Sequence, residues 1–179
     1  MAFLGTDRVL LAHREITLPD EAHPSHAIVL RHINQAEAHD PSWNPCELMI
    51  IRRTSDSYEM SGRTTKAVDC THIAFAREVA TSPDDLNDYL GLDNESGRVT
   101  YSNHYTRSVS IYSFEYSKEK DEWHLSGARN SYPLYNPESE EMQAVVEEIR
   151  YPDDFGWISM HDFDPEDLLE ALMKNRTVD

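Results

Sequence analysis

Apolar residues recur with the period of an α-helix in three segments, and each segment follows a proline. Their apolar positions are Met142, Val145, Val146 and Ile149 after Pro137, Leu168, Leu169, Leu172 and Met173 after Pro165, and Leu86, Tyr89 and Leu90 after Pro83. Residues three and four positions apart lie on one face of a helix. A capping residue precedes each proline, as at many helix starts: Ser82, Asn136 and Asp164. We therefore predict three amphipathic helices, the shortest ending at Gly91.

A β-hairpin is predicted where the pattern changes from helical spacing to alternation. Residues 109–116 are rich in β-branched and aromatic side chains, which favour strands. After a polar turn, Trp123 and Leu125 share one face of a second run, residues 122–126. The two runs and the turn between them indicate an antiparallel pair.

Other short segments complete the predicted fold. Residues 46–51 and 157–160 have the composition of short strands, whereas residues 24–38 fit either a strand or a helix. Helices interleaved with antiparallel hairpins predict the α+β class. We expect one globular domain over residues 1–179, because the length suits a single core and no Gly- or Pro-rich linker interrupts the chain. In that domain, several amphipathic helices would pack against an antiparallel sheet.

Composition predicts a folded protein in a reducing compartment. Hydrophobic residues make up 39% of the chain and charged residues 27%, which is enough apolar material for a core. The first residues lack a basic leader pattern, and no run approaches the roughly 18 apolar residues that a membrane span needs. A cytoplasmic location is the resulting expectation. Cys46 and Cys70 have no C-x-x-C spacing, so we expect reduced thiols.

Motifs for catalysis are missing from the sequence. It contains no G-x-S-x-G elbow, no phosphate-binding glycine loop and no activated cysteine pattern. The closest group of histidines, His23, His26, His32 and His39, lacks the spacing of a metal motif. We expect no cofactor and no metal site, and we expect that the protein is not an enzyme. A metal-dependent hydrolase that combines these histidines with carboxylates is the alternative.

Charge is the most informative property for function. The net charge is −17, and the last forty-two residues carry thirteen carboxylates against three basic side chains, a net charge of −10. Such a surface repels nucleic acid and anionic membranes and attracts basic proteins over about 8 Å at physiological salt. We therefore expect a basic protein as the partner, with no nucleic acid and no membrane. Solvated helix faces and solubility explain the same charges without a partner, and this alternative stays open.

Two stretches resemble small bacterial immunity proteins, which neutralise polymorphic toxins delivered by contact-dependent or type VI secretion systems. They are the hairpin at residues 112–125 and the ending at residues 153–169, which contains Asp153-Asp154-Phe155-Gly156-Trp157. The resemblance implies stoichiometric inhibition of a cognate toxin, often a cationic nuclease, by occlusion of its active site. A scaffold or regulatory subunit without inhibitory activity has the same sequence features.

Partner-binding residues are expected among the C-terminal carboxylates and the aromatic residues near them. They are Glu140, Glu141, Glu147, Glu148, Asp153, Asp154, Asp162, Glu166, Tyr151 and Trp157, with Tyr135 and Phe155 as further aromatic candidates. Carboxylates would steer the encounter with a basic partner and aromatic residues would anchor the complex. Core packing is the alternative role for Trp157 and Phe155.

Overall fold

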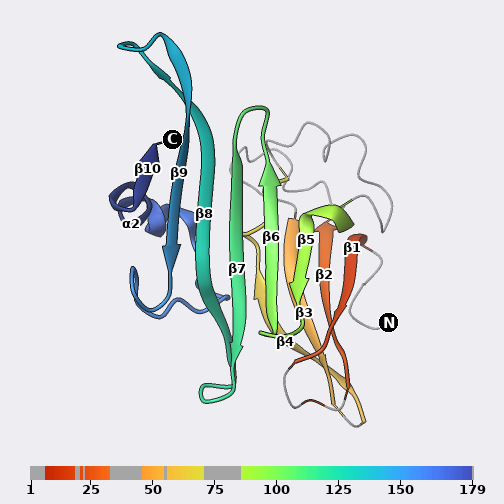
Figure 1. Cartoon of the computed structure of the whole chain (residues 1–179). Coiled ribbons are helices and arrows are strands. Elements are labelled where there is room, and N and C mark those ends of the chain that lie inside the picture. Colours follow the sequence, from red (N-terminus) through yellow and green to blue (C-terminus); the bar gives the residue numbers. More distant parts are fainter. Residues whose placement is uncertain are drawn as a thin grey trace.

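Two antiparallel β-sheets make up most of the protein (Figure 1), in a computed structural model that describes residues 7–18, 21, 23–32, 46–54, 56–70 and 86–178. The four-stranded sheet has the order β1-β2-β3-β4 and the six-stranded sheet the order β10-β9-β8-β7-β6-β5. The strands are β1 (Arg8–Ile16), β2 (Ser25–His32), β3 (Cys46–Arg53), β4 (Tyr58–Thr64), β5 (Leu90–Asp93), β6 (Arg98–His104), β7 (Val109–Ser117), β8 (Glu122–Asn136), β9 (Glu141–Arg150) and β10 (Arg176–Val178). The described helices are the 3₁₀ turns η2 (Asn87–Tyr89) and η3 (Pro165–Leu168) and the α-helix α2 (Leu169–Lys174).

The predicted α+β class is therefore wrong. Within the described residues, one α-helix of six residues accompanies ten strands, so several amphipathic helices do not cover the sheets. No helix in this part of the chain has the length and apolar character needed to cross a membrane. The single domain expected over residues 1–179 extends beyond the described residues and stays a prediction.

The largest error is the helix predicted after Pro137, because that segment is strand β9. Val145, Glu147 and Ile149 are buried at alternate positions, which is the period of a strand. Asn136 Oδ1 accepts a hydrogen bond from the Glu138 amide at 2.9 Å. The same side-chain bond can begin a helix or close a turn, and here it closes the turn between β8 and β9.

The other predicted elements have mixed outcomes. The strands at 46–51, 109–116 and 122–126 and the hairpin are confirmed, and residues 25–32 of the ambiguous segment form strand β2. A helix after Pro165 is confirmed as η3 and α2, with the Asp164 side chain accepting from the Glu166 amide. Its predicted apolar stripe is only half correct, because Leu168 and Leu172 are buried whereas Leu169 and Met173 are exposed. Residues 82–85 lie outside the described residues. The predicted helix beyond them is only the turn η2 followed by β5, and the predicted strand at 157–160 is a single bridge to β8.

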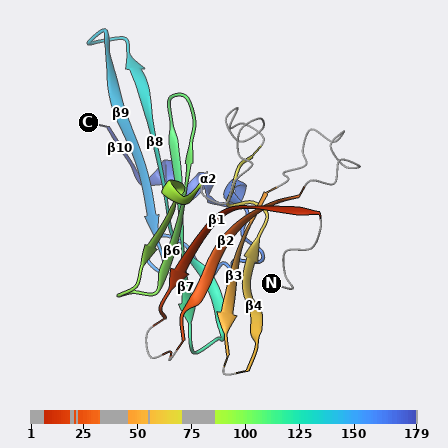
Figure 2. The same ribbon diagram turned by 90° about the vertical axis from the view of Figure 1, so that its right-hand side faces the viewer.

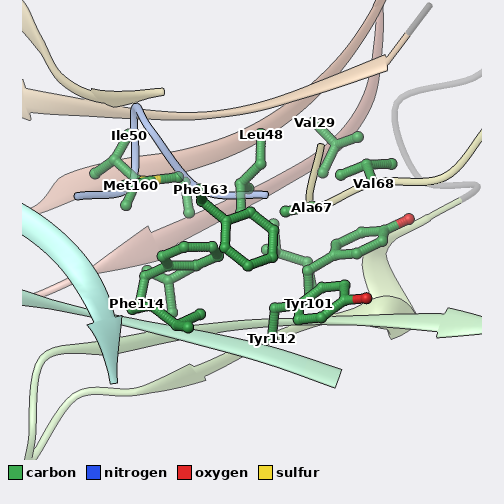
Figure 3. Close-up of a cluster of buried hydrophobic side chains, with 14 of the residues drawn as sticks. Val29, Leu48, Ile50, Ala67, Val68, Tyr101, Tyr112, Phe114, Met160 and Phe163 are labelled. Atoms are coloured by element: carbon green, nitrogen blue, oxygen red, sulfur yellow. The ribbon is translucent and has the colours of Figure 1, made fainter. Parts of the chain in front are cut away.

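The hydrophobic core lies between the two sheets (Figure 3). Leu48 and Ile50 reach it from β3, and Tyr101 and Phe114 reach it from β6 and β7. Phe163, from the segment that precedes η3, contacts the Phe114 ring edge-on with centroids 5.4 Å apart. The C-terminal segment thus contributes side chains to the core between the sheets.

A disulfide joins Cys46 to Cys70, so the predicted reduced thiols are wrong. The hairpin of β3 and β4 brings the two half-cystines together, with 5.9 Å between their Cα atoms, and both are buried. Their separation of 24 positions hides this pairing in the sequence. The bond fixes the start of β3 to the segment that follows β4.

Candidate protein-interaction surface

Strands β8 and β9 extend beyond the rest of the six-stranded sheet as a two-stranded arm, residues 132–144. Strand β7 pairs with β8 only as far as Val109 opposite Ser131, and β10 pairs with β9 only at residues 145–147. Figures 1 and 2 both show the end of this hairpin projecting past the neighbouring strands. Within the described residues, no further strand pairs with either edge of the arm, and most of its residues are exposed.

Large apolar side chains are exposed on the arm. Tyr135 and Met142 are directly opposite each other in the β8–β9 register, and their exposed fractions are 54% and 57%. Leu134 is exposed on the other face of the same ribbon. Exposed apolar groups gathered on a projecting element are typical of interaction sites, whereas isolated ones are common on any surface.

The charge of the arm is entirely negative. Glu138, Glu140 and Glu141 surround its tip, and no basic residue occurs between residues 132 and 144. Glu140 has a φ of 57°, a left-handed conformation that turns the chain back into β9. The turn thus displays carboxylates next to the apolar pair of Tyr135 and Met142.

A shallow hollow of about 530 Å³ lies where the arm meets the turn between β6 and β7. Its lining includes Tyr105, Arg107, Val109, Pro133 and Met142. A hollow lined by both apolar and polar residues can receive a protruding side chain of a partner protein. The hollow and the exposed pair share Met142, so they form one continuous surface.

Three of the predicted carboxylates are engaged within the protein, and one of them is Asp154, whose Oδ2 accepts a hydrogen bond from the Arg150 amide at 2.8 Å. Glu147 is buried and accepts a hydrogen bond from the Tyr132 hydroxyl at 2.7 Å, which raises the pKa of Tyr132. Glu148 Oε1 lies 2.5 Å from Arg150 Nη2 in an ion pair. Glu147 is thus absent from the exposed surface, and the charge of Glu148 is balanced by that of Arg150.

Tyr151 and Trp157 pack against each other and against His124. The Trp157 ring stacks on the His124 imidazole with centroids 4.2 Å apart, and Tyr151 meets both rings edge-on. Lys120 Nζ lies 3.6 Å from the centre of the Trp157 ring, a cation–π contact. Burial lowers the pKa of His124. His124 is buried, the Tyr151 and Trp157 rings are half-buried, and Phe155 packs beside Tyr151 against the core.

The predicted residues do not meet on one surface. Glu140 and Glu141 are at the tip of the arm, whereas Asp153 and Asp154 are in the turn at the other end of β9. The nine steps from Glu141 to Arg150 span about 30 Å at roughly 3.4 Å per residue. Asp162 and Glu166 are exposed in the C-terminal segment, outside the arm.

Leu134 and Met142 are the surface residues that the sequence reasoning missed. The helical interpretation places Met142 in a buried stripe, and no pattern in the sequence singles out Leu134. If residues 141–150 are interpreted as a strand, alternate side chains point to opposite faces. Met142 then lies on the face opposite to the buried Val145 and Ile149, and this alternation is the signal that could have identified it.

The histidines of the metal alternative are dispersed. His26 Nδ1 lies 3.0 Å from His13 Nε2, and burial, followed by the charge of His13, lowers the His26 pKa. His32, at the other end of β2, lies 3.0 Å from Glu47 Oε1. Six steps of strand separate His26 from His32 by about 20 Å. His39 lies outside the described residues. The part of the chain that the structure describes contains no group of three metal-ligating side chains.

No protein-family model and no curated protein matches this chain. A proposal for its function therefore has to be argued from the surface described above.

Proposed function

We propose that this protein is an acidic inhibitor that binds a basic partner protein through its β8–β9 arm. The observation that carries the proposal is the exposed pair of Tyr135 and Met142, next to a turn that carries Glu138, Glu140 and Glu141. Aromatic and methionine side chains are enriched at the centres of protein interfaces, and rim charges mainly set the rate of association. The arm combines both features on one projecting element.

The biological role that we propose is immunity against a cognate toxin, in keeping with the resemblance of the hairpin and the C-terminal segment to immunity proteins. A narrow ribbon whose residues are mostly exposed can enter a cleft, as an inhibitor of an active site must. Carboxylates at its tip can occupy positions that substrate phosphates take in a cationic nuclease. Inhibition is then stoichiometric, with no catalytic residue in this chain.

Binding to the product of the neighbouring gene tests the proposal. The two proteins are coexpressed, separated by size-exclusion chromatography and titrated by calorimetry. We expect a nanomolar complex, an association rate that falls as salt rises, and loss of toxin activity at one equivalent of inhibitor. Absence of a complex at micromolar concentrations would contradict the immunity role.

The compartment of this function is a separate question. A cytoplasmic location is the sequence-based prediction, and the Cys46–Cys70 disulfide argues against it because disulfides persist mainly in oxidising compartments. Alkylation of free thiols in intact cells distinguishes a cytoplasmic location from an oxidising compartment. Two alkylated cysteines would support the cytoplasm, and two protected ones would support an oxidising compartment.

A further inference from the structure

Three arginines surround a hollow of about 370 Å³ on the face of the six-stranded sheet that points away from the core. They are Arg98 of β6, Arg129 of β8 and Arg150 of β9. The floor includes Ser113 and Ser126. Guanidinium groups gathered from three strands are unusual in a chain with a net charge of −17, because carboxylates outnumber basic side chains by about two to one.

Two of these arginines are paired and one is free. Arg98 Nε lies 2.6 Å from Glu115 Oε1, and Arg150 Nη2 lies 2.5 Å from Glu148 Oε1. Arg129 is directly opposite Glu148 in the β8–β9 register. Glu148 nevertheless bonds to Arg150, and Arg129 makes no ion pair or hydrogen bond with any described residue. Of the three guanidinium groups at the hollow, Arg98 and Arg150 are therefore each balanced by one carboxylate, whereas Arg129 is not.

Ser126, one of the residues that line the same hollow, has a hydroxyl without a partner among the described residues. Its Oγ atom is buried. Ser126 falls at the irregularity where β7 and β8 change register, between Leu125 and Gly127. A buried hydroxyl without a partner is destabilising unless a ligand or water satisfies it. This hydroxyl is a second, independent feature that indicates a bound polar group.

We propose that this hollow binds an oxyanion of a small molecule, a carboxylate or a phosphate. Arg129 supplies a free planar fork that can donate two parallel hydrogen bonds to such a group. A change of the Ser126 rotamer would turn its buried hydroxyl toward a further oxygen, and the charges of Arg98 and Arg150 at the same hollow are compensated by Glu115 and Glu148. The site is independent of the arm and of the proposed inhibitor function, since none of its residues belongs to the arm.

The test is a titration of the full chain with inorganic phosphate and, separately, with succinate, followed by NMR shifts of backbone amides. Chloride at equal ionic strength is the reference. We expect saturable shifts centred on residues 126–129 for at least one probe, and the probe that binds more tightly identifies the group as phosphate or carboxylate. Absence of saturable shifts with both probes overturns the proposal.

Variants separate a built site from general charge attraction. Arg129→Gln removes the free guanidinium, and Arg107→Gln removes one positive charge from the β6–β7 turn, outside the hollow. We expect Arg129→Gln to weaken binding by about tenfold or more and Arg107→Gln by less than about twofold. Ser126→Ala is expected to weaken it severalfold, with unchanged thermal unfolding as the check on folding. Equal effects of the two arginine variants would contradict the proposal.

Discussion

Trp123 Nε1 donates a hydrogen bond to Ser61 Oγ at 2.7 Å, which ties strand β8 of the six-stranded sheet to strand β4 of the four-stranded sheet. The Trp123 side chain is fully buried. Its ring lies against Gly62, the residue that follows Ser61, and Met160 packs at the same point. The junction of the two sheets therefore depends on the absence of a side chain at position 62.

Gly62→Ala is expected to destabilise the protein by about 1–3 kcal/mol, the usual effect of overpacking a core. A Cβ atom there would lie 2.9 Å from Met160 Sδ and 3.0 Å from Trp123 Cδ1. Gly156→Ala is the matched control, because nothing lies within 4 Å of its added Cβ. Urea unfolding of both variants checks the prediction, and equal stabilities would refute it.

Glu47 is a fully buried carboxylate whose removal is expected to be costly. Arg63 Nε lies 2.7 Å and His32 Nε2 lies 3.0 Å from its two oxygens, and Arg8 Nη1 lies 3.5 Å away. Glu47→Gln leaves these basic groups without their charge partner, so we expect a loss of about 3–5 kcal/mol. Glu119→Gln on an exposed turn is the control. A loss below about 1 kcal/mol in denaturant unfolding would contradict this role.

The Cys46–Cys70 disulfide predicts that denatured, unreduced protein contains no free thiol. Replacement of both cysteines by alanine is expected to lower the free energy of unfolding by about 2–4 kcal/mol, because the cross-link restricts the unfolded chain. Thiol titration and unfolding with and without reductant measure the two effects. Two titratable thiols in freshly purified protein would show that the bond does not form.

Acid is expected to destabilise the protein through His124. Burial holds its folded pKa below the unfolded value of about 6.5, so the unfolded chain takes up the proton first. The stabilising contribution is complete above about pH 6.5 and is lost as pH falls below it, by at most about 1.4 kcal/mol per pH unit. His124→Phe keeps the stacked ring and should flatten this fall in unfolding measured from about pH 8 to about pH 5. An unchanged pH dependence would exclude His124 as its source; His26, whose pKa is also lowered, contributes with the same sign.

Local patterns in the sequence predicted the hairpin of β7 and β8 and the capped turn at Asp164, since both depend on neighbouring residues. They failed at β9, where Met142, Val145, Val146 and Ile149 fit a helical stripe by spacing. Pairing with β8 overrides that preference and buries Val145 and Ile149 on one face. The disulfide was not predicted for the same reason, since only the pairing of β3 with β4 brings Cys46 close to Cys70.

The candidate surface was predicted only in part. An excess of carboxylates near residues 138–141 is visible in the composition, and the structure places them at the tip of the arm. Trp157 could bind a partner or pack within the protein, and its stacking on His124 favours packing. No spacing in the sequence reveals this contact. Exposure of Met142 likewise depends on where β7 ends beside β8.

Two methionines of similar exposure allow a matched test of whether the β8–β9 arm binds the partner. Met142 on the arm is 57% exposed and Met173 on α2 is 64% exposed. Neither is part of the core, so both variants to serine should keep the unfolding free energy within about 0.5 kcal/mol. Any difference in binding between them therefore reports the location of the interface.

The decisive measurement is the dissociation constant of each variant for the product of the neighbouring gene. We predict that Met142→Ser combined with Tyr135→Ser raises it by at least about thirtyfold, the effect of losing about 2 kcal/mol at an interface centre. Met173→Ser should change it by less than about twofold. A double arm variant that binds as tightly as the unaltered protein would contradict the assignment of the arm as the inhibitory surface.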